Sequence, residues 1–154
     1  MRTIALALLV ATALAGCGRD STPATASASA AAQEAQARVG DVTVHASVVQ
    51  TSTLDASIAQ RYGLERSDRI ALLLVSARRD GDAPLPPTLT IEARASAGSA
   101  AATPIALRPL EIDGSVDYVG TVDIAPPETL RFDVVVNYGT AASTLQFTRD
   151  FYPR

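Results

Sequence analysis

The sequence predicts an all-β domain, a two-layer antiparallel sandwich of about seven strands with an immunoglobulin-like arrangement and one short helix. Three observations lead to this fold class. Apolar and polar residues alternate with a period of two in most segments after residue 39, as in half-buried strands. Turn-forming pairs such as Asp80-Gly81 separate these segments, and a single stretch has helical spacing. A small barrel is the alternative arrangement, because short alternating strands also suit a closed sheet.

Alternation locates the strands. In the segment TLRFDVVVNYG, the apolar residues Leu130, Phe132 and Val134 fall on one face. The polar residues Arg131 and Asp133 fall on the other face, which indicates one buried and one solvated side. The expected strands, in chain order, are residues 41–49, 69–77, 88–96, 104–112, 115–124, 129–139 and 144–151.

Two of these strands have special features. Residues 70–75 are apolar on both phases, which indicates a strand covered on both faces or a buried helix. The short length of this run and the turn at Asp80-Gly81 favour a strand. Residues 104–112 contain Pro109, which has no backbone N–H to donate to a ladder. We therefore expect that segment at a sheet edge or at a bulge.

The exception to the strand pattern is the segment TSTLDASIAQRYGLERS, which predicts a helix over residues 54–62. Thr53 is suited to cap this helix, and Asp55 suits its first turn. Apolar residues up to Ile58 recur with helical spacing, and Gly63 suits the left-handed position at the C-terminal end. The helix lies between the strand at 41–49 and the strand at 69–77.

The N-terminus has the build of a secretory signal peptide over residues 1–16. Its apolar run is far shorter than the ~20 residues that span a bilayer. The segment LAGC that follows resembles the lipobox of bacterial lipoproteins, which implies cleavage before Cys17 and acylation of that residue, with palmitate as a typical chain. The alternative is an ordinary cleavable signal that leaves Cys17 as a free or bridging thiol, although the chain holds no second cysteine.

Acyl chains on Cys17 would anchor the protein in a membrane, because each buried methylene contributes about 0.8 kcal/mol. Gly18 follows the cysteine, and the resemblance to lipoprotein sorting signals then implies the outer membrane, with the protein facing the periplasm. Residues 17–38 lack aromatic residues and a periodic apolar face, so we expect a disordered tether, with a marginal helix near its end as the alternative. The folded domain then comprises residues 39–154.

Composition argues against several functional classes. All 13 basic residues are arginines scattered along the chain and the formal net charge is −3, so no basic patch for nucleic acid is expected. A single histidine, His45, and a cysteine committed to lipid leave no set of metal ligands, and we expect neither a metal nor another cofactor. His45 lies on the polar face of its strand, so a Ser-His-acid triad is not expected. Without a glycine-rich phosphate loop or closely paired carboxylates, the sequence predicts a protein that is not an enzyme.

Binding is the remaining class. The densest set of recognition-type side chains surrounds the end of the expected helix. Arginine and tyrosine are favoured at contact hot spots, and arginine can hold a carboxylate or phosphate through two hydrogen bonds. Alternatively, Tyr62 packs the helix onto the sandwich, and Arg66 caps the helix or pairs with a neighbouring acid. The candidate binding residues are Arg61, Tyr62, Arg66, Ser67 and Arg69.

The segments RYGLERSDRIALLLV, YVGTVDIAPPETLRFDVVV and FTRDFYP resemble a family of small periplasmic proteins from Gram-negative bacteria that is known as a domain of unknown function. The family's core is a Tyr-Gly-aliphatic-x-Arg-Ser turn after a short helix, here residues 62–67. The resemblance covers residues 41–153 and implies the fold and the location without an activity. Family members carry an aromatic residue and an asparagine before the helix, where this chain has HASVVQTSTL.

Three functions follow as hypotheses. The first is a membrane-anchored lipoprotein whose sandwich binds an envelope protein or a glycan without catalysis. The second is a structural factor for envelope stability or assembly that has no discrete site. The third is a carrier of a small ligand in the space between the two sheets.

Overall fold

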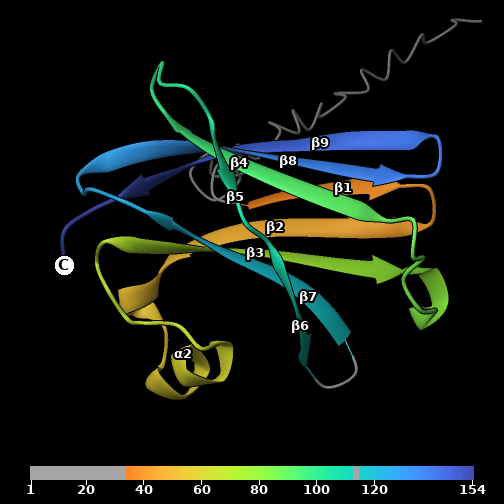
Figure 1. The fold of residues 1–154 in the computed structure, drawn as a ribbon, viewed down its shortest axis with the longest axis horizontal. Helices are drawn as coiled ribbons and strands as arrows, with labels where there is room; N and C mark the ends of the chain where they lie inside the picture. The colour runs from red at the N-terminus through yellow and green to blue at the C-terminus, as the bar shows by residue number, and fades with distance from the viewer. Residues whose placement is uncertain (1–33, 113–114) are drawn as a thin grey trace, which may run out of the picture.

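The computed structural model describes residues 34–112 and 115–154, which form two antiparallel sheets packed face to face (Figure 1). The first sheet has the order β1-β2-β3-β7-β6, and the second has the order β5-β4-β8-β9. The predicted all-β sandwich is confirmed. The strands are β1 (Glu34–Val39), β2 (Val42–Gln50), β3 (Ile70–Arg79), β4 (Thr90–Ala97), β5 (Thr103–Ile105), β6 (Arg108–Ile112), β7 (Ser115–Asp123), β8 (Glu128–Tyr138) and β9 (Ala141–Phe151).

The core lies between the two sheets, where the apolar phases of the alternating strands meet. Val42 and Val44 of β2 and Val75 of β3 are fully buried on one side. Phe132 of β8 and Phe147 of β9 stack on the other side, with ring centroids 5.4 Å apart. Removing these side chains from water is the main source of stability in such a fold.

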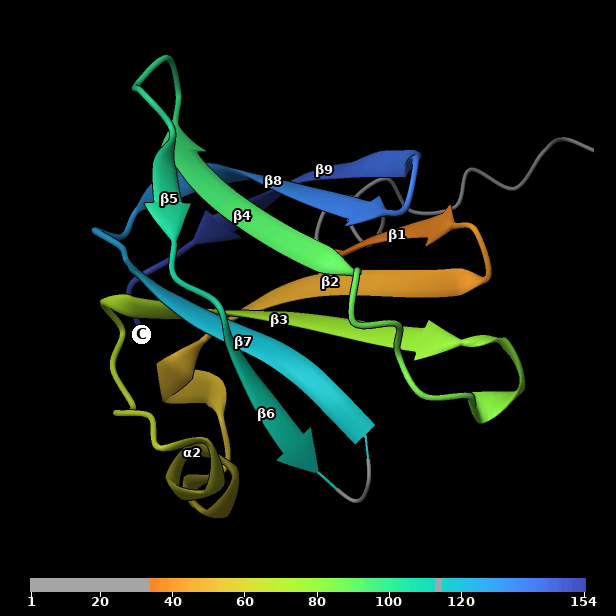
Figure 2. The ribbon, with the colours of Figure 1, turned by 45° about the vertical axis from the view of Figure 1, so that its right-hand side comes forward.

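The sheets meet along one margin and are linked by the chain along the other. β1 runs next to β9 at the first margin (Figure 1). At the second, the chain leaves β5 and crosses to β6 in the other sheet (Figure 2). Residues 104–112 therefore divide into two strands, each at a sheet edge, and the edge position predicted from Pro109 is confirmed. A Cβ at Gly120 would lie 2.6 Å from Cγ2 of Ile105, so this crossing needs a glycine in β7.

β1 corrects the tether boundary, because strand structure begins at Glu34, within the segment 17–38 that composition predicts as tether. Ala35 and Ala37 are half-buried against the core, and the backbone pairs with β2 in an antiparallel ladder. Alanine is depleted in strands, so the pattern was too weak to reveal a strand, and the alternative marginal helix is wrong for β1. The earlier residues, including Cys17, lie outside the described residues.

The predicted helix is present as α2 (Ala56–Tyr62), preceded by the 3-10 turn η1 (Thr51–Thr53). Its cap is Asp55 and not Thr53, because the Ser57 backbone N–H donates to Asp55 Oδ1 at 2.7 Å. Thr53 instead donates from its hydroxyl to the Gln50 carbonyl at 2.7 Å and belongs to η1. Gly63 ends the helix in the left-handed conformation, with φ 65° and ψ 40°, as predicted.

Three buried side chains lie outside the main core: Ala59 of α2, Leu72 of β3 and Val119 of β7. Leu72 and Val119 lie on the phase of their strands opposite to the inner residues, so the outer face of the first sheet is covered near α2. This second cover explains why β3 is apolar on both phases, and it confirms the interpretation of residues 70–75 as a strand.

The Asp80-Gly81 pair does not form a hairpin. It lies in the 3-10 turn η2 (Asp80–Asp82), where Gly81 has φ 69°. Residues 83–89 then carry the chain from β3 in the first sheet to β4 in the second (Figure 2). We call residues 83–89 the β3–β4 linker; it contains three prolines, which restrict its backbone and withhold N–H donors.

Candidate functional site

The structure brings together the predicted binding residues near α2, but it gives most of them structural roles. The Thr51 hydroxyl donates to the Ser67 carbonyl at 3.1 Å and accepts from the Ser67 N–H at 3.0 Å. The Ser67 hydroxyl accepts from the Arg69 N–H at 3.1 Å. Arg66 donates to the Ser52 carbonyl at 3.0 Å. Ser67 and Arg66 therefore hold the loop after the helix against η1.

Tyr62 is half-buried at the last position of α2. Its backbone carbonyl accepts a hydrogen bond from the Arg108 guanidinium of β6. A cation at the C-terminal end of a helix satisfies a free carbonyl and opposes the partial negative charge there. This contact attaches the helix end to the edge of the first sheet, so Tyr62 also has a structural role.

Arg61 and Arg69 differ from these residues, since both are exposed and neither side chain has a partner within the described part of the chain. Arg69 also borders a pocket of about 270 Å³ with Asp68, Ala125, Pro126 and Pro153. Three segments far apart in sequence therefore converge here: the loop after α2, the β7–β8 connection and the C-terminus.

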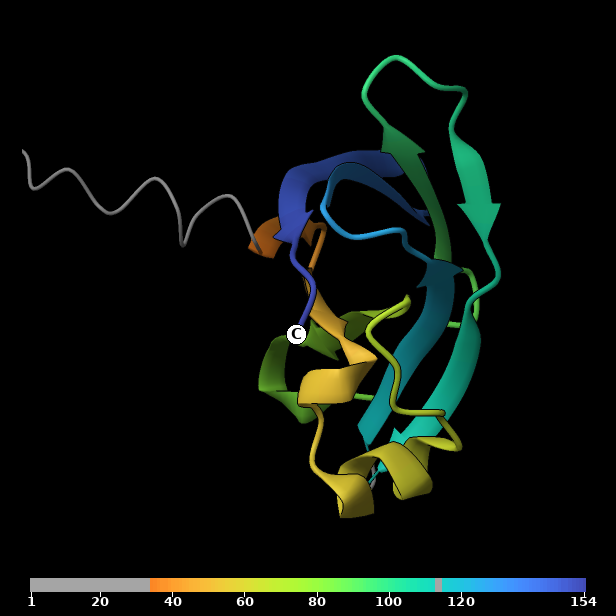
Figure 3. The same ribbon diagram turned by 90° about the vertical axis from the view of Figure 1, so that its left-hand side faces the viewer.

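Gln50 joins two of these segments. Gln50 is 6% exposed, and its side-chain amide donates to the carbonyls of Asp68, at 2.9 Å, and Tyr152, at 3.1 Å. The C-terminus consequently ends near η1, on the side of the sandwich where α2 lies (Figure 3). Tyr152 remains 63% exposed, and Ile58 of α2 is 41% exposed. Sequence analysis did not select either residue, because neither periodicity nor spacing reports which side chains remain uncovered.

These two residues are the exposed large apolar side chains of the described region. They lie at the same end of the sandwich as the two free arginines. We call Ile58, Arg61, Arg69 and Tyr152 the helix-end surface. Aromatic and arginine side chains of this kind are the residues that contribute most to binding at protein interfaces.

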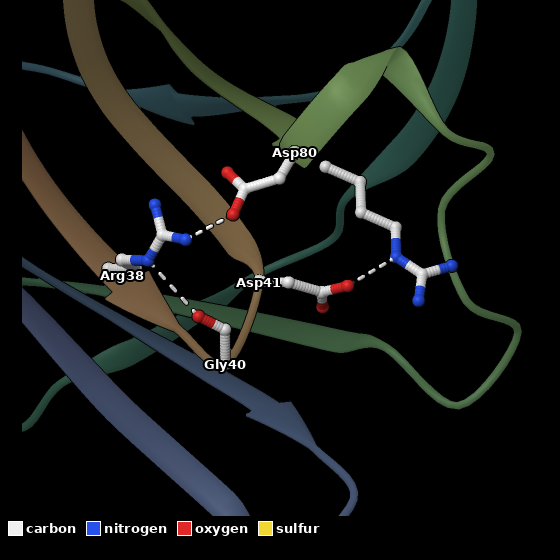
Figure 4. A network of polar contacts seen from close by, with 5 residues as sticks. Arg38, Gly40, Asp41 and Asp80 are labelled. Atoms are coloured by element: carbon white, nitrogen blue, oxygen red, sulfur yellow. Dashed lines mark hydrogen bonds and ion pairs between the residues drawn. The ribbon is translucent and has the colours of Figure 1, made fainter.

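The opposite end of the sandwich holds a network of ion pairs (Figure 4). Arg38 pairs with Asp80 and donates from Nε to the Gly40 carbonyl at 3.2 Å. Arg79 donates from Nε to Asp41 Oδ2 at 2.7 Å, which holds the pKa of Asp41 below its usual value. The same contact raises the pKa of Arg79. The network fastens the β1–β2 turn to the end of β3.

A larger pocket of about 630 Å³ adjoins this network. It lies between the end of β3, the β3–β4 linker and the start of β7, and we call it the linker pocket. Apolar groups, including Leu85, Leu89 and Tyr118, form slightly more than half of its wall, and Arg79 is one of its two charged residues. The sequence did not predict this pocket, because a local pattern does not report the space between a linker and a sheet.

The described residues contain no group of three or more His, Cys, Asp or Glu side chains placed to hold a metal ion. His45 lies exposed on the outer face of β2, opposite Gln36 of β1 and Ser76 of β3. Within the same residues, no helix has the length and apolar character needed to cross a bilayer.

Residues 36–154 match the family described as domain of unknown function DUF4426. The chain belongs to the DUF4426 family. This match spans the sandwich from the third residue of β1 onward and contains both the helix-end surface and the linker pocket. No functionally curated protein matches the sequence of this DUF4426 chain.

A crystal structure of a DUF4426 family protein from Pseudomonas aeruginosa is similar, with a TM-score of 0.62 and 26% sequence identity, over 79% of this chain and 96% of that chain. Two structures of FetP from uropathogenic Escherichia coli, a copper-bound variant and the as-isolated protein, each have a TM-score of 0.50 and 10% identity. They cover 77% and 79% of this chain and 97% and 99% of the respective FetP chains. The likeness to FetP concerns the fold alone.

Proposed function

We propose that this DUF4426 protein is a lipid-anchored protein of the cell envelope whose sandwich binds a protein or glycan partner without catalysing a reaction. The helix-end surface is the binding site in this proposal. The anchor is an acylated Cys17, and the domain faces the periplasm from the outer membrane. The lipobox-like segment LAGC supports the anchor, and the contacts described above support the binding surface.

The exposure of Tyr152 is the main observation in favour of the helix-end surface. Tyr152 is 63% exposed although its backbone is fixed by Gln50. An aromatic ring on a fixed backbone adds apolar contact area at a small cost in conformational entropy. Arg69 lines the same pocket as Pro153, the residue after Tyr152, and its free guanidinium can donate two hydrogen bonds to a carboxylate or to sugar hydroxyls. A tyrosine on a fixed backbone and an unpaired arginine at the same end of the sandwich are residue types favoured in partner recognition.

The binding experiment compares detergent-solubilised envelope captured by the wild-type protein and by the double variant Tyr152→Ala/Arg69→Ala. We expect the wild type to retain a reproducible partner, and we expect the variant to lose it while its unfolding midpoint stays unchanged. Arg94→Ala is the matched control, because Arg94 is an exposed arginine on the outer face of β4. Equal capture by all three proteins would contradict the helix-end surface as the site.

The anchor has a separate test. Mass spectrometry of the mature N-terminus should find an acylated Cys17, and Cys17→Ser should move the protein from the membrane fraction to the periplasmic extract. An unmodified N-terminal fragment in the wild type would contradict the lipoprotein proposal. The binding proposal would survive that result, since the two rest on different residues.

A further inference from the structure

The linker pocket opens onto the inner face of the first sheet, where the second sheet gives way to the β3–β4 linker. Tyr118 of β7 pairs with the buried Val75 of β3, so Tyr118 and Val116 belong to the inner phase. Both are only half-buried, unlike Val75, which is fully buried. The apolar inner face is therefore incompletely covered at this end, and the uncovered part forms the wall of the pocket.

The pocket walls favour an apolar occupant. Three of the linker residues, Pro84, Pro86 and Pro87, have no N–H to donate. Arg78 is engaged, because its guanidinium donates to Asp117 at 2.9 Å and to the Ala77 carbonyl at 2.8 Å. Besides Arg79, the side chains that can hydrogen-bond a ligand here are Ser115 and Tyr118, fewer than a desolvated sugar or extended peptide needs. An alkyl chain needs none.

Arg79 is the charged residue of the pocket that can bind a polar head group of the ligand. It follows Ala77 on the inner phase of β3 and lines the pocket. Its Nε donates to Asp41, while its two terminal nitrogens have no partner among the described residues. The side chain is 32% exposed and accessible from the pocket. The terminal edge of such a guanidinium can hold a carboxylate or phosphate through two hydrogen bonds.

We propose that the linker pocket binds a single-chain amphiphile, with the alkyl chain against Leu85, Val116 and Tyr118 and an anionic head group at Arg79. The volume of about 630 Å³ is within the range of small-molecule sites. The pocket lies at the opposite end of the sandwich from α2 and the helix-end surface (Figure 1). It therefore does not depend on the partner-binding proposal.

The test titrates the full chain with decanoate and with 1-decanol, two probes that share an alkyl chain and differ in head charge. Calorimetry should show saturable binding of decanoate at concentrations where the probe stays monomeric. Amide shifts in ¹⁵N NMR spectra should cluster at residues 77–79, 83–89 and 115–118. Binding that does not saturate, or shifts that gather near α2, would overturn the proposal.

Variants separate the two parts of the site. Arg79→Gln should weaken decanoate at least about tenfold and leave 1-decanol almost unchanged, because it removes the head contact and leaves the alkyl walls in place, although it also breaks the pair with Asp41. Arg38→Gln is the control for damage to the ion-pair network, since Arg38 does not line the pocket, and it should leave both affinities unchanged. Equal weakening of both probes by Arg79→Gln would overturn the assignment of the head group.

A third variant tests the alkyl site. Val116→Trp places bulk in the pocket and should weaken both probes at least tenfold. Val135→Trp is its matched control, because Val135 is also a half-buried strand valine but lies outside the pocket. Thermal unfolding confirms that each variant is folded before titration. Undiminished binding to folded Val116→Trp would overturn the proposed position of the alkyl chain.

Discussion

The side-chain amide of Gln50 donates to the Tyr152 carbonyl at 3.1 Å across a sequence separation of 102 residues. The same amide donates to the Asp68 carbonyl at 2.9 Å. One buried side chain thus connects the end of β2 to the loop after α2 and to the C-terminal segment. Since the helix-end surface takes residues from both segments, its geometry depends on this amide.

Replacement of this amide should destabilise the protein. Gln50→Leu keeps a similar volume and removes both donors, leaving two carbonyls without their partner. We expect a loss of about 1–3 kcal/mol in the free energy of unfolding, together with faster amide exchange near the C-terminus. Urea unfolding and hydrogen-exchange mass spectrometry measure the two effects. Gln146→Leu, at an exposed position of β9, is the matched control and should change stability by less than about 0.5 kcal/mol.

Sequence reasoning could predict the strands because burial imposes an alternating pattern along each one. It located β2, β3, β4, β7, β8 and β9 and the left-handed turn at Gly63. It could not predict the contact between Gln50 and Tyr152, because nothing local in either segment encodes it. It missed β1 for a different reason, since the small alanine side chains on its inner phase resemble those of a flexible tether.

The pair formed by Asp41 and Arg79 should make stability depend on pH. The hydrogen bond from Arg79 lowers the pKa of Asp41 in the folded protein, so the folded state binds a proton at this carboxylate less readily than the unfolded state. The stabilisation is therefore present above about pH 4 and is lost as pH falls through the folded pKa. We expect Asp41→Asn to be less stable than the wild type at pH 7.

The difference between Asp41→Asn and the wild type should shrink as pH falls from about 4 toward 2. Urea unfolding at a series of pH values measures it. High salt provides an internal control, because screening weakens ion pairs between partly exposed groups. A difference that stays constant over this range would show that Asp41 acts through packing and not through its charge.

The crossing from β5 to β6 should be intolerant of added volume at Gly120. A Cβ there would lie 2.6 Å from Cγ2 of Ile105 and 2.8 Å from the Ala106 carbonyl oxygen. The backbone must shift to relieve the second contact, so we expect Gly120→Ala to cost about 1–3 kcal/mol. Thr121→Ala, at the exposed neighbouring position, controls for the strand itself. Equal unfolding midpoints for the two variants would contradict a tight crossing.

The candidate binding residues were predictable as a cluster but not in their roles. Residue type and spacing placed arginines and a tyrosine around the helix end, and the structure brings them together. Whether each one contacts a backbone carbonyl or solvent depends on η1 and β6, which the local pattern does not report. Arg66 and Arg69 illustrate this, because two arginines three positions apart have different surroundings.

Because their surroundings differ, truncation of Arg66 and truncation of Arg69 should have different effects on stability. Arg66→Ala removes a hydrogen bond to the Ser52 carbonyl and should lower stability by about 0.5–1 kcal/mol, the low end for a solvent-exposed contact. Arg69→Ala removes no side-chain hydrogen bond or ion pair among the described residues and should leave stability within about 0.5 kcal/mol of the wild type. Urea unfolding measures both variants, and amide shifts near Ser52 should change in the first only.

Arg69→Ala should affect partner capture more than Arg66→Ala, the reverse of their effects on stability. Arg69→Ala should weaken retention of the partner, because its guanidinium is free to bind. Arg66→Ala should retain the partner at temperatures where it is fully folded, since Arg66 donates from a terminal nitrogen to Ser52 and serves the loop in this proposal. A matched pair of single arginine variants thus separates loss of recognition from loss of structure. Equal loss of capture by both variants, at equal stability, would assign Arg66 to the binding surface as well.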